Sequence, residues 1–190
     1  MDKYFSFFNP VFDYLDSGKL FRQPFRILYY IIGLTIALGC LFSIGFVFDF
    51  IKDFNAAAYI YAVVGVMVLV ASAVFSFIYW WKRAQDINSD VSQKSRFQAI
   101  PAVSGLIINL GEWIGVVGAA ITFVMGVVGA VILPMAEKYG NTHIFWKFIM
   151  IAVLGPIVAY IFWVIFRLIG EQILAIGTIA SETRKIAEKK

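Results

Sequence analysis

The stretch that decides the fold is PAVSGLIINLGEWIGVVGAAITFVMGVVGAVILP, residues 101–134. Small residues recur in it at the spacing of one helix face: Gly111, Gly115, Gly118, Thr122, Gly126 and Gly129. In water so many glycines would weaken a helix, by up to about 1 kcal/mol each relative to alanine. In a bilayer, where helices associate by close packing, the same face favours the approach of a neighbouring backbone. We therefore predict the central transmembrane helix of a bundle, with these six residues as its packing face.

The composition of the whole chain is typical of an integral membrane protein. The chain has 190 residues, of which 61% are hydrophobic, and a mean hydropathy of +0.83. Its apolar runs reach the length of about 20 residues that crosses a hydrocarbon core. The net charge is +4, but the basic residues cluster between the apolar runs, which indicates membrane orientation rather than nucleic-acid binding. The lipid bilayer is thus the expected partner, and no nucleic acid is expected.

The apolar runs predict one all-α membrane domain over residues 1–190, a four-transmembrane-helix bundle. The four spans are expected at about 25–48, 57–81, 101–134 and 144–168. The aromatic, amphipathic residues 1–24 predict an N-terminal interfacial helix, with a disordered tail as the alternative. Residues 169–190 remain periodic after the last span and predict a C-terminal amphipathic helical extension in the cytoplasm.

The third apolar run is longer than one membrane requires. Residues 101–134 would measure about 50 Å as a single helix, compared with a hydrocarbon core of about 30 Å. A strongly tilted span would explain this length. Alternatively, residues 101–112 form an interfacial or re-entrant piece before a span that begins near Trp113, and the sequence leaves these alternatives open.

The basic residues are distributed unevenly between the segments that flank the spans. Twelve lie in the first, third and fifth polar segments: Lys3, Lys19, Arg22, Arg26, Lys82, Arg83, Lys94, Arg96, Arg184, Lys185, Lys189 and Lys190. Three lie in the two opposite segments: Lys52, Lys138 and Lys147. Because positive residues accumulate on the cytoplasmic side, this asymmetry places both termini and residues 82–98 in the cytoplasm.

Aromatic and basic side chains at the ends of the spans are expected to mark the membrane interfaces. Tyr79, Trp80 and Trp81 close the second span, and Trp113 stands near the start of the third. Lys147 lies near the start of the fourth span, where its ammonium group can reach the interface. We predict these five residues as interface anchors.

Glu112 is the ionisable residue of greatest functional interest, because a carboxylate at membrane depth is costly. Three alternatives are open: a solvated group at the interface beside Trp113, a group near an ion path, or a partner of Arg167 in a buried ion pair. Arg167 is expected at the same depth on the last helix, and Glu171, one turn further, competes for it. We predict Glu112 and Arg167 as a candidate ion pair.

No pattern of catalytic or metal-binding residues occurs in the sequence. The single cysteine, Cys40, lies in the first span and the single histidine, His143, in a short loop. The sequence has no HExxH motif, no phosphate-binding glycine loop followed by lysine, and no Ser/His/Asp set. We therefore expect a protein that is not an enzyme and that uses no cofactor or metal.

Two stretches carry a resemblance. One runs from RLIGE at 167–171 to ETRKIAE at 182–188, and the other covers residues 97–115 with Ile100-Pro101, Ser104 and GEW at 111–113. Together they make up about a quarter of the chain. They resemble uncharacterised small multi-span membrane proteins of the Bacteroidetes type, which contain a domain of unknown function. The resemblance implies a bacterial inner (cytoplasmic) membrane and no particular activity.

These observations predict a non-enzymatic accessory or scaffolding subunit. It would pack through its Gly-rich helix faces with other membrane proteins or with itself, although packing within the chain is the simpler role for the stripe on residues 111–129. The first alternative is a small oligomeric channel or transporter subunit, with Glu112 near its path and Ser104 and Thr122 lining it. The second is a lipid-binding or stress-response membrane protein that uses the aromatic N-terminal segment.

Overall fold

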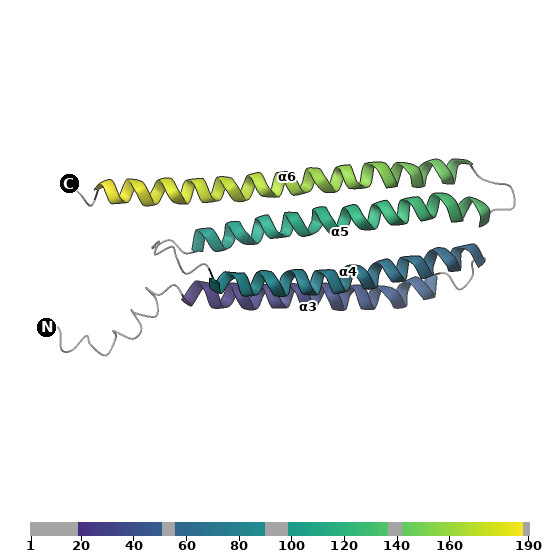
Figure 1. Ribbon diagram of the computed structural model, residues 1–190, viewed down its shortest axis with the longest axis horizontal. Coiled ribbons are helices and arrows are strands. Elements are labelled where there is room, and N and C mark those ends of the chain that lie inside the picture. The colour runs from purple at the N-terminus through teal and green to yellow at the C-terminus, as the bar shows by residue number, and fades with distance from the viewer. Residues whose placement is uncertain (1–18, 51–55, 90–98, 137–141, 188–190) are drawn as a thin grey trace.

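The computed structural model describes residues 19–50, 56–89, 99–136 and 142–187, which form four long α-helices and, within these ranges, no strand (Figure 1). The helices are α3 (Lys19–Phe50), α4 (Ala56–Ser89), α5 (Ala99–Ala136) and α6 (Thr142–Ala187). Each contains a segment long and apolar enough to cross a membrane: Gln23–Val47, Ala58–Ile87, Ile100–Pro134 and His143–Thr183. The predicted class, an all-α multi-pass membrane protein with four spanning helices, is confirmed.

The helices extend beyond the predicted spans. Because α3 begins at Lys19, residues 19–24 belong to the first membrane helix and not to a separate interfacial segment. The predicted interfacial helix itself, residues 1–18, lies outside the described residues. At the other end, α6 runs without interruption to Ala187, so the predicted C-terminal extension continues the last membrane helix.

The continuity of α5 removes one of the alternatives that its sequence leaves open. It is one continuous helix of 38 residues, which corresponds to about 57 Å at 1.5 Å per residue. Residues 101–112 are therefore continuous with the rest of α5 and do not form a separate re-entrant piece.

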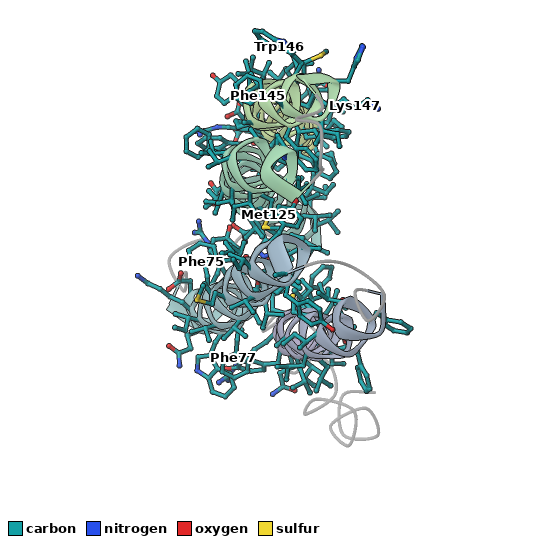
Figure 2. All side chains as sticks on the ribbon, turned by 90° about the vertical axis from the view of Figure 1, so that its right-hand side faces the viewer. Phe75, Phe77, Met125, Phe145, Trp146 and Lys147 are labelled. Carbon is teal, nitrogen blue, oxygen red and sulfur yellow. The ribbon has the colours of Figure 1, made fainter. Side chains whose placement is uncertain are left out.

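The four helices lie in an open row and do not close around a common centre. Consecutive helices run antiparallel (Figure 1), and contacts are most extensive between α5 and α6, then between α3 and α4, and smaller between α4 and α5. Viewed along the helix axes, α6, α5 and α4 follow one another and α3 lies beside α4 (Figure 2). The protein thus consists of two helical hairpins, α3–α4 and α5–α6, joined through α4 and α5.

The stripe of small residues on α5 lies against α6. A Cβ atom added at Gly126 would lie 2.5 Å from the backbone nitrogen of Ala152, and one at Gly115 would lie 2.8 Å from Trp163 Cβ. Added Cβ atoms at the two ends of the stripe would meet aromatic side chains of α6: Gly111 would meet Phe166, and Gly129 would meet Phe148. The stripe therefore serves packing between two helices of the same chain.

Glycines of α6 make the matching contacts with α5. An added Cβ atom at Gly155 would meet the side chain of Thr122, the one non-glycine member of the stripe. Near the C-terminal end of α6, added Cβ atoms at Gly170 and Gly177 would meet Ile108 and Ile100 of α5. Small residues of each helix thus make room for larger side chains of the other, and the two backbones come closest where Gly126 meets the backbone of Ala152.

The α3–α4 hairpin packs around one tryptophan. The Trp80 side chain is fully buried, and its ring centroid lies 5.3 Å from that of Tyr29, which is 2% exposed. An added Cβ atom at Gly33 would lie 2.9 Å from Trp80 Cβ, so the missing side chain of Gly33 makes room for the indole. Ala84, one turn after Trp80, completes this core.

Candidate functional site

The α4–α5 interface contains an ion pair between Arg83 and Glu112, and the Tyr79 hydroxyl binds the same carboxylate. Arg83 of α4 donates from Nη2 to Glu112 Oε2 of α5 at 2.5 Å, and the Tyr79 hydroxyl donates to the same oxygen at 3.0 Å. The Arg83 guanidinium also lies over the Tyr79 ring, 5.3 Å from its centroid. Side-chain exposure is 36% for Arg83 and 23% for Glu112, so both charges are half-buried. The charge of a half-buried carboxylate is stabilised by its donors, because few water molecules can reach it to take their place.

Neutral hydrogen bonds extend this cluster to α3 and further along α4. Asn109 donates from Nδ2 to the Tyr29 hydroxyl of α3 at 3.0 Å. The Trp113 indole N–H donates to Ser76 Oγ at 2.8 Å, and the Ser76 hydroxyl donates to the backbone oxygen of Ser72 at 2.6 Å. Glu112 and Trp113 follow Asn109 by three and four residues, so the three share the face of α5 that meets the first hairpin.

This geometry corrects the predicted Glu112–Arg167 pair. Arg167 instead donates from Nε to Glu171 Oε1 at 3.0 Å, the competing partner on its own helix. Both of those side chains are more than half exposed. The reason lies in the direction of the Glu112 side chain: its neighbour Gly111 faces α6, whereas Glu112 faces α4. The two charges are level with each other, but the α5 backbone separates them.

The five predicted interface anchors fall into two groups. Trp81 is 46% exposed and Lys147 is also exposed, as an interface position requires. Tyr79 and Trp113 are partly buried and donate hydrogen bonds within the protein. Trp80 is fully buried in the α3–α4 hairpin, so its assignment as an anchor is corrected to a core residue.

The two hydroxyl groups that the channel alternative places along its path donate hydrogen bonds to backbone oxygens. The Ser104 hydroxyl is buried and donates to the Gly170 oxygen of α6 at 2.7 Å. The Thr122 hydroxyl donates to the Gly118 oxygen of its own helix at 2.7 Å. The Ser104 hydroxyl therefore links α5 to α6, and the Thr122 hydroxyl binds within the preceding turn of its own helix.

Sequence reasoning missed Arg83, Asn109, Tyr29 and Ser76 as members of this site. Part of the signal is present, because Tyr79 and Arg83 are four residues apart and so share one face of α4. The missing information was which helix lies beside α5 on that face.

Among the described residues no three His, Cys, Asp or Glu side chains come together.

No protein-family model, curated protein or solved structure matches this chain. The site is therefore interpreted from its own geometry. It holds one carboxylate that two donors satisfy, and it joins three helices. Such an arrangement is suited to fixing one hairpin against the other.

Proposed function

We propose that this multi-pass membrane protein is an accessory or scaffolding subunit that lies in a bacterial inner membrane, with both termini in the cytoplasm. It packs against other membrane proteins or against copies of itself. The observation that carries this proposal is the apolar outer face of α6 beyond Arg167.

The polar end of α4 supports a membrane boundary at its level. Glu112 pairs with Arg83 on one side of α5, and its neighbour Gly111 faces Phe166 on the other, so Arg83 is level with Phe166 and Arg167. The end of α4 beyond Tyr79 is polar and charged, as expected of a segment that leaves the hydrocarbon core. We therefore place the membrane interface near the Arg83–Glu112 pair.

Beyond this level α6 continues to Ala187, about 30 Å further. Figure 1 shows its C-terminal end projecting past the other three helices. Large apolar side chains are exposed along this part: Leu168, Ile169, Leu174, Ile176, Ile179 and Ile186. Ile176 and Ile179 are each 66% exposed. With the membrane interface near the Arg83–Glu112 pair, this surface lies beyond the hydrocarbon core, and apolar surface of this kind outside the membrane is typical of an interaction site.

The partner surface proposed here differs from the Gly-rich face of α5, because α6 already covers that face. Partners would instead contact the outer face of α6. An edge position in the row supports this assignment, since α6 packs mainly on α5 and leaves its other side open.

In-cell photo-cross-linking tests the proposal. A photoreactive amino acid at Ile176 should give a discrete protein adduct, whose mass identifies either a second copy or another membrane protein. The matched control is Ile157, which is 49% exposed but lies in the apolar middle of the same helix, where lipid is the expected neighbour. The absence of a protein adduct at Ile176, or the same adduct at both positions, would contradict a partner surface beyond the membrane.

No observation on the described residues favours the channel or transporter alternative. Glu112 is neutralised by Arg83, and Ser104 and Thr122 are bound to backbone oxygens. A pH-dependent flux in proteoliposomes that Glu112→Gln abolishes without loss of stability would favour that alternative.

A further inference from the structure

A groove lies between α5 and α6 and runs from Lys147, at the end of the protein opposite the Arg83–Glu112 pair, to Ile114 and Phe162. It is an open groove with a volume of about 720 Å³. Its lining is almost wholly apolar and includes Ile114, Gly118 and Thr122 of α5 and Gly155, Ala159 and Phe162 of α6. At one end the lining includes a single charged residue, Lys147.

Small residues on both helices leave the floor of this groove open. An added Cβ atom at Gly118 would meet only Ala159 Cβ, at 3.6 Å, so this position of the stripe is not filled by α6. The Thr122 hydroxyl is engaged by backbone oxygens of its own helix, the Gly118 oxygen at 2.7 Å and the Ala119 oxygen at 3.2 Å. The floor therefore attracts a hydrocarbon chain better than a polar ligand.

The dimensions of the groove suit one acyl chain. From Lys147 to Phe162 it follows α6 for about 22 Å, at 1.5 Å per residue. Half of a hydrocarbon core of about 30 Å is about 15 Å, so the groove covers the depth of one leaflet and reaches past the midplane.

The residues around Lys147 indicate that this end of the groove lies at a membrane interface. Trp146 is 62% exposed and Phe145 is 38% exposed, and Figure 2 shows these residues with Lys147 around the first turns of α6. Exposed aromatic rings beside a lysine are characteristic of the headgroup level. Within the described part of the chain, Lys147 makes no ion pair or side-chain hydrogen bond. Its ammonium group is therefore available to an anion at this level.

We propose that this groove binds one anionic phospholipid, with an acyl chain along Gly118, Gly155 and Ala159 and its phosphate group at Lys147. The apolar lining and the lone cation at the interface end match the two halves of such a lipid. The site is independent of the partner surface on α6 beyond Arg167, which lies at the other end of the helix.

Native mass spectrometry of the full chain in detergent tests this site. The probes are phosphatidylglycerol and phosphatidylcholine with identical acyl chains, titrated separately. The wild-type protein should retain one phosphatidylglycerol in preference to phosphatidylcholine. Lys147→Gln should lower the phosphatidylglycerol affinity about fivefold, the effect of one lysine near an anionic surface, and leave phosphatidylcholine unchanged. The matched control is Lys82→Gln, an exposed lysine outside the groove, which should have no such effect.

A second pair of variants tests the acyl-chain part of the groove. Gly118→Phe fills the floor and should abolish the bound lipid of both kinds, whereas Gly118→Ala should retain it. If Gly118→Phe does not fold, Val158→Trp narrows the groove from its rim, where Val158 is 49% exposed, and should have the same effect.

The proposal is overturned if Lys147→Gln behaves like Lys82→Gln, or if a folded variant with a filled groove keeps its lipid. A dimer that Gly118→Phe or Val158→Trp dissociates, without any change in lipid binding, would show that the groove holds a second copy. That result would also overturn the lipid assignment.

Discussion

Arg83 Nη2 lies 2.5 Å from Glu112 Oε2 and thereby connects the α3–α4 hairpin to the α5–α6 hairpin. The interface between α4 and α5 is smaller than the interface within either hairpin. The ion pair, with the Tyr79 and Trp113 hydrogen bonds beside it, therefore forms a polar link between the two hairpins at this smaller interface.

The first prediction concerns this pair. Glu112→Gln and Arg83→Gln should each destabilise the protein, because each leaves a half-buried charge without its partner. A double-mutant cycle on the free energy of unfolding in mixed micelles should give a coupling energy of about 0.5–3 kcal/mol. The exchange of Arg83→Glu with Glu112→Arg should recover part of the loss.

Arg167 provides the matched control for this cycle. It is level with Glu112 but pairs with Glu171, so a cycle between Glu112→Gln and Arg167→Gln should give a coupling energy near zero. A large Glu112–Arg167 coupling together with a negligible Glu112–Arg83 coupling would reverse the assignment made here.

The second prediction concerns the stripe on α5. Gly126→Ala places a methyl group 2.5 Å from the Ala152 backbone nitrogen, and because a backbone cannot rotate away, the helices must separate. We expect a loss of about 1–3 kcal/mol in the free energy of unfolding, as is typical of overpacking. Gly118→Ala is the control, since its Cβ atom would only touch Ala159 at 3.6 Å. Equal effects of the two substitutions on thermal stability would argue against the packing described for α5 and α6.

The third prediction compares two glycines within α3. Gly33→Ala should destabilise the protein, because the added Cβ atom would lie 2.9 Å from Trp80 Cβ. Gly45→Ala meets nothing within 4 Å and should be neutral or stabilising, since alanine favours a helix over glycine by up to about 1 kcal/mol. Thermal unfolding in detergent measures both effects. A larger loss of stability for Gly45→Ala than for Gly33→Ala would contradict the face of α3 that is described here as packing against α4.

The helices and their contact faces differ in how well the sequence predicts them. Spans follow from hydropathy and length, because a bilayer admits few alternatives to a helix of sufficient length. Depth along each helix is also readable from the sequence: Arg83, Glu112 and Arg167 are level with one another in the structure.

The choice of neighbour could not be read in the same way. Arg83 and Arg167 are both at a suitable depth for Glu112, and the choice depends on which side of α5 each neighbouring helix occupies. The open row is likewise a property of packing between helices, which hydropathy does not encode. Trp80 shows the same difficulty, because a tryptophan near a span end suits the interface by composition and the core by contact.

We propose that these four helices cross a membrane in turn, with both termini in the cytoplasm. Single cysteines at Gln85, His143 and Ala187, all exposed positions, test it in a Cys40→Ala background. In intact spheroplasts a membrane-impermeant maleimide should label the His143 position alone, and permeabilisation should expose the positions at Gln85 and Ala187. Labelling of Gln85 and His143 from the same side of the membrane would contradict the four-span arrangement.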